Sequence, residues 1–130
     1  MGRLIPFDFS THFLESLRSC YYVLQHGKVL CYFPEGLRSS TGEIGEFKKG
    51  FGILAKETGA KLLPVAIEGA HEAWASTEKY PKRHRIRVRF GKPLRSGDLE
   101  KEGMAMGAQN CYAAICVAAR KALLDLRDQK

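Results

Sequence analysis

The spacing of apolar residues along the chain predicts three helices. Apolar side chains recur at every third or fourth position in residues 10–26, 47–59 and about 104–128. Gly27 and Gly59 are placed to end the first two helices. The expected apolar stripes consist of Phe13, Leu17, Tyr21 and Leu24; of Phe47, Phe51, Leu54 and Ala55; and of Ala108, Tyr112, Ile115, Ala119, Leu123 and Leu126.

Four strands are expected: one before the first helix, one between the first two helices, and two after the second helix. Short apolar runs occupy residues 3–7, 28–33 and 62–67, although Pro64 lacks a ladder donor and indicates an edge or irregular position. Residues 85–90 alternate strictly, which predicts apolar side chains on the buried face and arginines on the outer face. Alternation of strands and helices favours right-handed crossovers. We therefore expect an α/β fold with a mostly parallel or mixed sheet of about four strands, covered by helices.

Size and charge narrow the class of protein. The 130 residues fit one domain, and no internal repeat or linker divides them. A net charge of +7 favours an anionic partner, which could be a phospholipid surface, an acidic carrier protein, a nucleotide-bearing cofactor or nucleic acid. The last is disfavoured, since no face combines aromatic and basic residues for base stacking. No stretch approaches the roughly 20 apolar residues of a membrane span, so membrane contact is expected to be peripheral.

The four cysteines are expected to be reduced core thiols of a cytoplasmic protein. They form no Cys-x-x-Cys pair and follow no signal peptide. Cys111 and Cys116 are five positions apart, so they do not share a helix face as zinc ligands would. We expect neither a metal nor a cofactor.

The segment Phe-Pro-Glu-Gly-Leu-Arg-Ser at residues 33–39 is the main candidate for chemistry. Gly36 permits a tight turn and a close approach of the backbone to a ligand. Arg38 offers a planar fork of donors that suits a phosphate or a carboxylate. Glu35 places a carboxylate beside this cation, and the pattern predicts an anionic substrate.

Ligands of open parallel sheets bind beyond the carboxyl ends of the strands. Asp8 follows the first expected strand, Glu35 and Arg38 follow the second, and Glu68 follows the third. These four residues are therefore expected along one rim of the sheet.

Residues 33–39 resemble the phosphate-binding motif of the glycerophospholipid acyltransferase family, usually Phe-Pro-Glu-Gly-Thr-Arg-Ser, with Leu37 in place of threonine. Residues 2–8 look like the segment before the family's Phe-Ile-x-Arg block, but end in aspartate where an arginine often occurs. Residues 45–50 are similar to its Pro-Phe-Lys-x-Gly motif, and residues 63–67 to its Val-Pro-Val-x-Ile strand. The resemblance, to the 1-acylglycerol-3-phosphate acyltransferase type, covers roughly residues 2–93.

The resemblance implies transfer of a fatty acyl group from acyl-CoA or acyl carrier protein to a hydroxyl of a lysophospholipid or glycerol phosphate. In that family a His and an Asp five positions apart activate the hydroxyl, and this pair is missing here. No catalytic residue is therefore assigned, and His71 is interpreted as a structural or rim histidine. The chain is expected to be the carboxyl-terminal portion of such a domain, glycerol-3-phosphate acyltransferase-like, and inactive alone. The residues five positions after His12, His26, His71 and His84 are Leu17, Cys31, Ser76 and Arg89.

The expected substrate-binding residues are Glu35, Gly36, Arg38, Ser39 and Lys48. Arg38 is the phosphate ligand, and Glu35 organises the loop. Two alternatives remain at this stage: Glu35 and Arg38 could form a surface ion pair, and Lys48 could belong to a solvated helix start.

Arginines 85, 87 and 89 are candidate contacts with an anionic membrane, and a solvated face is the alternative interpretation. Arg85, Arg87 and Arg89 also define a rival function, a non-catalytic module that binds anionic lipid or acyl carrier protein. A partial domain would expose apolar surface, so self-association is expected.

Overall fold

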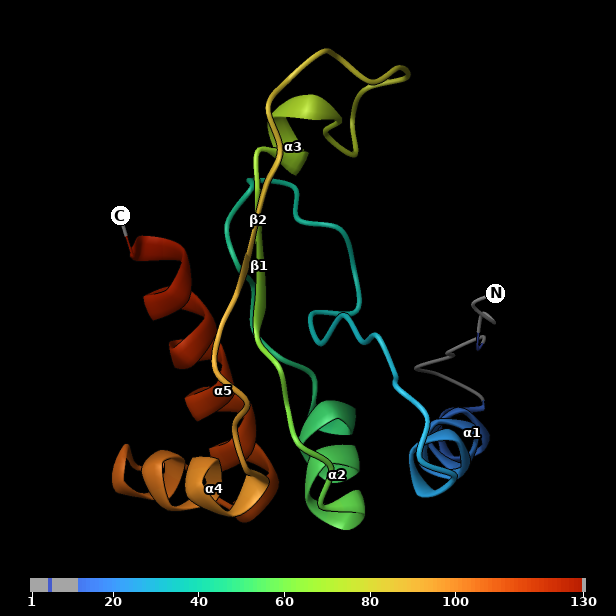
Figure 1. Ribbon diagram of the computed structural model, residues 1–130, viewed down its shortest axis with the longest axis vertical. Coiled ribbons are helices and arrows are strands. Elements are labelled where there is room, and N and C mark those ends of the chain that lie inside the picture. Colours follow the sequence, from blue (N-terminus) through green and yellow to red (C-terminus); the bar gives the residue numbers. More distant parts are fainter. Residues whose placement is uncertain (1–4, 6–11, 130) are drawn as a thin grey trace.

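Two strands and five helices form the described part of the chain, which in this computed structural model comprises residue 5 and residues 12–129. The helices are α1 (Phe13–Gln25), α2 (Lys49–Thr58), α3 (Ala70–Ala73), α4 (Ser96–Ala105) and α5 (Cys111–Asp128). The strands are β1 (Val65–Glu68) and β2 (Arg87–Phe90). Figure 1 shows α5 beside the two strands, α4 and α2 at the same end of the molecule, and α3 at the opposite end.

The main core lies where α2 and α4 pack on α5. Ile115 of α5 is fully buried and belongs to a cluster with Ala55 of α2 and Leu99 of α4. Two glycines allow the close packing: a Cβ at Gly52 would lie 2.3 Å from the Tyr112 carbonyl oxygen, and one at Gly103 would lie 2.0 Å from that of Ala114. The small residues of these helices therefore set how near the backbones approach.

A smaller core joins α1 to α2. Leu17 and Cys20 of α1 are buried with Leu54 of α2. The α1 helix ends as expected, with Gly27 at a φ of 66° and its N–H donating to the carbonyl of Leu24. The expected stripe of α1 is wrong at Tyr21, which is 43% exposed, and Cys20 occupies the buried face instead.

The sheet is smaller than expected and antiparallel. β1 pairs with β2 in the register Val65–Phe90, Ala66–Arg89, Ile67–Val88 and Glu68–Arg87, and an isolated bridge joins Leu62 to Leu94. The helix-and-sheet class is confirmed. The parallel arrangement is wrong here, because β1 returns to β2 through α3 and a loop and not through a long crossover helix.

Of the other expected strands, residues 28–33 form none within the described chain, and residues 3–7 lie outside it except for Ile5. An apolar run becomes a strand only where a neighbouring backbone completes its hydrogen bonds.

The orientation of β2 reverses the expectation from its alternation. Val88 and Phe90 are 48% and 68% exposed, whereas the Arg89 side chain is 23% exposed. The register places Arg89 opposite the buried Ala66, on the side that contacts α5. Arg89 therefore lies on the covered side of β2, whereas Val88 and Phe90 lie on the open side.

The expected single helix over residues 104–128 is two helices. Gly107, with a φ of 88°, follows the end of α4, and the Asn110 side chain caps α5 by accepting a hydrogen bond of 2.9 Å from the Ala113 N–H. The buried positions Ile115, Ala119 and Leu126 match the predicted stripe.

The cysteines are free, as expected, but only two of them belong to the core. Cys20 and Cys116 are buried, Cys111 is half-buried and Cys31 is exposed.

Candidate functional site

A groove of about 1380 Å³ runs between residues 28–44 on one side and β1 with α3 on the other. Four of the predicted binding residues line it, namely Glu35, Gly36, Arg38 and Ser39. Much of the remaining wall is apolar and consists of Val23, Val29, Leu30, Phe33, Leu37, Ile44 and Ile67. The groove thus combines two exposed cations, Arg38 and Lys28, with a long apolar lining.

The turn that carries Glu35 is fixed from two sides. Gly36 adopts a φ of 76°, and its N–H donates to the Phe33 carbonyl at 3.1 Å. The Glu35 carboxylate accepts a hydrogen bond of 2.7 Å from the Gly45 N–H, and the Lys48 N–H donates to the Pro34 carbonyl at 2.8 Å. Glu35 therefore closes a loop of the chain.

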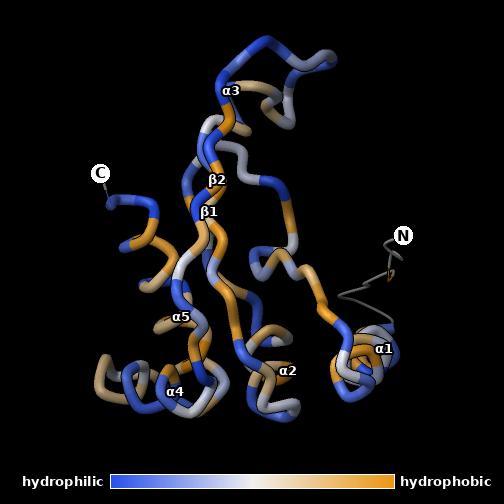
Figure 2. The backbone as a smooth tube through the Cα atoms, viewed as in Figure 1, coloured by the Kyte–Doolittle hydropathy of each residue, from blue (hydrophilic) through white to orange (hydrophobic). Residues whose placement is uncertain are grey.

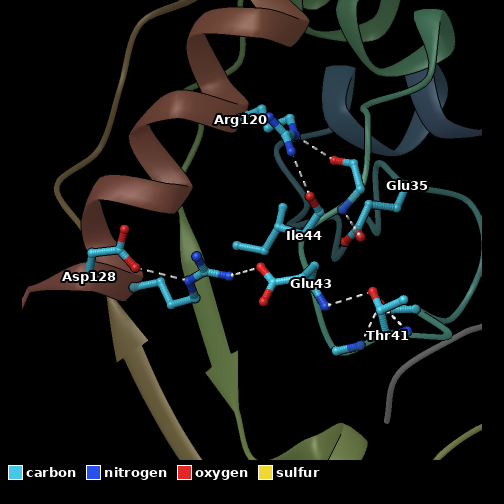
Figure 3. A network of polar contacts seen from close by, with 10 residues as sticks. Glu35, Thr41, Glu43, Ile44, Arg120 and Asp128 are labelled. Atoms are coloured by element: carbon cyan, nitrogen blue, oxygen red, sulfur yellow. Dashed lines mark hydrogen bonds and ion pairs between the residues drawn. The ribbon is translucent and has the colours of Figure 1, made fainter.

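The C-terminal half of α5 holds the same loop from the other side. Arg120 donates to the carbonyls of Ile44 and Gly45, both at 2.8 Å, and Arg127 pairs with Glu43 at 2.7 Å. Figure 3 shows Arg120 reaching the loop at Ile44, close to Glu35, and Glu43 in its ion pair nearby. Sequence reasoning missed both arginines, although they lie seven positions apart and therefore on one face of a helix.

Arg38 contacts Trp74 and not Glu35. Its guanidinium donates to the Trp74 carbonyl, and its central carbon lies 5.2 Å from the centre of the indole ring. No carboxylate among the described residues forms an ion pair with Arg38. The interpretation of Glu35 and Arg38 as a surface ion pair is therefore wrong.

Ser39 shapes the far end of the loop. Its hydroxyl accepts hydrogen bonds from the N–H groups of Gly42, at 2.9 Å, and Thr41, at 3.3 Å. Gly42 has a φ of 84°, and a Cβ there would lie 3.3 Å from the ring of His71, which also lines the groove. His71 is thus a rim histidine, packed against the loop.

Two of the residues expected at the site, Lys48 and Glu68, do not line the groove. Lys48 is the exposed N-cap of α2 and does not line the groove. Glu68 faces Arg87 at 3.5 Å and Arg89 at 3.4 Å, and lines a separate hollow of about 270 Å³. Its side chain separates from the others because β1 is antiparallel to its neighbour. Asp8 lies outside the described residues.

The three candidate membrane arginines have different surroundings. Arg89 donates to the carbonyls of Arg127, at 2.6 Å, and Gln129, at the end of α5. Arg87 is 52% exposed beside Glu68, and Arg85 lines the smaller hollow. Arg89 is therefore engaged within the fold, while Arg85 and Arg87 remain near the surface.

The thiols of Cys20 and Cys116 and the phenol of Tyr32 stay protonated at neutral pH. Burial raises the pKa of the Cys20 thiol, which lines the groove, and that of Cys116. Burial, and then the neighbouring Cys20 and Cys116, raise the pKa of Tyr32 to about 12. Since a thiol must ionise to act as a nucleophile or metal ligand, Cys20 is an inert part of the wall.

The described residues contain no cluster of three or more His, Cys, Asp or Glu side chains suited to a metal ion. None of their helices is both long enough and apolar enough to cross a bilayer.

Comparison with known proteins identifies the class. A sequence model of the acyltransferase family, described as Acyltransferase, matches residues 5–68, which include the Glu35 turn and β1. The chain also resembles a crystal structure of the 1-acyl-sn-glycerophosphate (LPA) acyltransferase PlsC from Thermotoga maritima, with a TM-score of 0.69 and 21% identity over 90% of this chain and 47% of that one. The fold of the chain and nearly half of its sequence therefore match the acyltransferase family.

Curated proteins with similar sequences give a second comparison. It is 35% identical over 80 residues, 62% of its length, to a protein of Cocos nucifera named 1-acyl-sn-glycerol-3-phosphate acyltransferase. A protein of Pseudomonas aeruginosa with the same name is 38% identical over 60 residues, 45% of this chain. The chain is similar to these two proteins and spans 26% and 23% of their length.

Proposed function

We propose that the groove binds the phosphate-bearing acceptor of an acyl transfer reaction. The acceptor would be a lysophospholipid or glycerol phosphate, and the donor acyl-CoA or acyl carrier protein. The observation that carries this proposal is Arg38, an exposed cation that lines an apolar groove and has no carboxylate partner in the described chain. The names of the relatives support the same class of substrate.

The composition of the groove suits an amphiphile. Among the described residues, Arg38 donates a hydrogen bond to the Trp74 carbonyl. Most of its five N–H donors therefore remain for a phosphate. The apolar side chains nearby would cover a hydrocarbon chain and remove it from water. A single lysophosphatidate molecule presents both kinds of surface.

Binding of lysophosphatidate can be measured by calorimetry with a short-chain form below its micelle concentration. Arg38→Ala is expected to weaken binding by about tenfold or more, since a charge-assisted hydrogen bond contributes about 1.5–3 kcal/mol. Arg18→Ala, which removes an exposed guanidinium of α1 outside the groove, is the matched control. Equal affinity of the Arg38 and Arg18 variants would refute the proposal.

Glu35 is proposed to act through the loop and not as a ligand, because its carboxylate already accepts the Gly45 N–H. Glu35→Gln keeps an acceptor oxygen and is expected to bind lysophosphatidate nearly as well as the original chain. Glu35→Ala removes the acceptor and should bind more weakly. An equal loss with glutamine and with alanine would show that the charge itself is needed.

Residues 1–130 are proposed to be the carboxyl-terminal portion of a single acyltransferase domain, without a catalytic His and Asp pair of its own. A general base contributes about 10²–10⁴ in rate, so transfer by the isolated chain should be negligible. Turnover of acyl-CoA and lysophosphatidate that Glu35→Ala abolishes would contradict this.

A non-catalytic module that binds anionic lipid is the second candidate, and would place the chain at the cytoplasmic surface of a membrane. The loop after α3, residues 75–86, supports it: Lys79, Lys82, Arg83 and Arg85 are exposed there, and the loop projects beyond the strands in Figure 1. Cations near an anionic leaflet contribute about 1 kcal/mol each.

Sedimentation with phosphatidylglycerol vesicles separates the two candidates. Binding that survives Arg38→Ala but is lost when Arg85 and Arg87 are replaced by glutamine favours the module. Arg89→Gln is kept as a separate variant, because Arg89 also holds the end of α5.

A further inference from the structure

Trp74 contacts the proposed phosphate ligand in two ways. It is the one tryptophan of the chain and lies directly after α3. Its carbonyl accepts a hydrogen bond from Arg38, and its ring lies 5.2 Å from the guanidinium carbon. Both residues line the same groove, although 36 positions separate them in the sequence.

The ring of Trp74 is itself held in place. Its indole N–H donates to the Glu78 carbonyl at 2.9 Å, and its backbone N–H donates to Ala70 at 3.0 Å. Lys82 braces the same turn, because its N–H donates to the Ala73 carbonyl at 2.6 Å and its amine pairs with the Glu78 carboxylate. An aromatic face fixed in this way restricts where a guanidinium can lie.

This restriction matters because arginine is a long side chain. An exposed arginine samples many rotamers, and ordering it on binding costs conformational entropy. A guanidinium that already rests on an aromatic face loses less freedom when a phosphate binds its outer edge. Stacking uses the face of the guanidinium, while a phosphate uses the N–H groups at its edge, so both contacts can exist together.

We propose that Trp74 is a positioning residue that holds the Arg38 guanidinium at the groove for a phosphate monoester. The proposal rests on the function proposed for Arg38, and adds a residue outside the motif of residues 33–39 that determines how well that arginine works. The ligand class is a monoester such as glycerol 3-phosphate or the head of lysophosphatidate.

The first experiment observes Arg38 in the free protein. The side-chain Nε–H signal of Arg38 in a ¹H–¹⁵N spectrum should carry a ring-current shift from the indole, assigned by its loss in Arg38→Lys. Trp74→Ala should move this signal to the position of an unstacked arginine, and Trp74→Phe should retain much of the shift. Tyr80→Ala is the matched control, since it removes an exposed aromatic residue of the same loop whose ring centre lies 5.5 Å from Lys79 Nζ and which does not line the groove.

The second experiment measures binding of glycerol 3-phosphate and of short-chain lysophosphatidate. We expect Trp74→Ala to weaken both by about fivefold, which corresponds to about 1 kcal/mol. Trp74→Phe should restore affinity to within about twofold, because it keeps an aromatic face. Tyr80→Ala should bind as the original chain does, and its Trp74 fluorescence should still change on binding.

The outcomes distinguish this inference from the proposed function. If Arg38→Ala abolishes binding while Trp74→Ala neither shifts the Arg38 signal nor weakens binding, the positioning role is wrong and the phosphate site stands. If Trp74→Ala shifts the Arg38 signal but neither variant affects binding, the phosphate site is wrong, and the role of Trp74 toward a phosphate fails with it.

Discussion

Tyr32 links the stability of the fold to alkaline pH. Its ring packs near Phe51, with 5.9 Å between the ring centres, and burial is the main reason that its pKa rises to about 12. The neighbouring thiols of Cys20 and Cys116 raise it further, since a thiolate would repel a phenolate. The folded chain therefore holds this proton more tightly than an unfolded chain, in which a tyrosine ionises near pH 10.

The sign of the pH effect follows from these two values. Stability from the neutral Tyr32 is fully present below pH 10, and is lost as the pH rises through the folded pKa of about 12. Urea unfolding should show stability that falls as the pH rises above 10, and Tyr32→Phe should reduce this slope. Tyr22→Phe, which alters an exposed side chain of α1, should leave the slope unchanged.

The residues of the site differ in how far the sequence could predict them. Glu35, Gly36 and Arg38 lie in one short segment, where a glycine and two opposite charges indicate a ligand-binding turn. The separate partners of the two charges, Gly45 and Trp74, were not predictable, because local sequence does not say which distant segment a side chain will meet. An ion pair between Glu35 and Arg38 was the alternative interpretation. In the structure Glu35 accepts a hydrogen bond from the Gly45 N–H, and Arg38 donates one to the Trp74 carbonyl.

Among the elements, the contact between α4 and α5 depends on a glycine. A Cβ at Gly103 would meet the Ala114 carbonyl oxygen at 2.0 Å, and a backbone atom cannot yield as a side chain can. Gly103→Ala is therefore expected to destabilise the fold by about 1–3 kcal/mol or more, as overpacking in a core does. Urea unfolding provides the measurement.

Gly97 of the same helix is the control for this prediction. No atom lies within 4 Å of a Cβ built at Gly97, so Gly97→Ala should leave stability unchanged or raise it by up to about 1 kcal/mol through helix propensity. Similar losses for both variants would mean that helix packing does not depend on Gly103.

Arg89 stabilises the end of α5. Its guanidinium donates to carbonyls at the last turn, where a helix leaves acceptors unsatisfied. Arg89→Gln should increase hydrogen exchange in residues 123–128 and lower stability by about 1–2 kcal/mol. Arg87→Gln, which alters the more exposed neighbour on the same face, should have the smaller effect. Equal protection of α5 in both variants would contradict the capping role.

Elements with strong local signals were predictable, and elements set by pairing were not. Glycines with positive φ come after the ends of α1 and α2, and α2 matches its expected range closely. The break between α4 and α5 has the same kind of signal at Gly107, together with a capping Asn110, but the continuous apolar spacing obscured it. Strand pairing and the direction of β2 depend on distant segments, so alternation alone gave the wrong covered face.

At the scale of the whole molecule, one face of the sheet is open. Four side chains cover it, Val65, Ile67, Val88 and Phe90, and each is between 36% and 68% exposed. The opposite face meets α5, where Ala66 is only 2% exposed. Figure 2 shows hydrophobic segments along both strands and in the chain after α1, where residues 29–33 line the groove.

Exposed apolar surface of this kind favours association, because burying it removes it from water. We expect the chain to self-associate through this face, with a sedimentation coefficient that rises with protein concentration. Val88→Lys should shift the equilibrium toward monomer, since a lysine in the centre of the face would have to be desolvated. Leu14→Lys is the matched control, because Leu14 is 68% exposed on α1, away from the strands. A chain that stays monomeric at every concentration would contradict the expectation, and equal effects of the two lysines would locate the contact elsewhere.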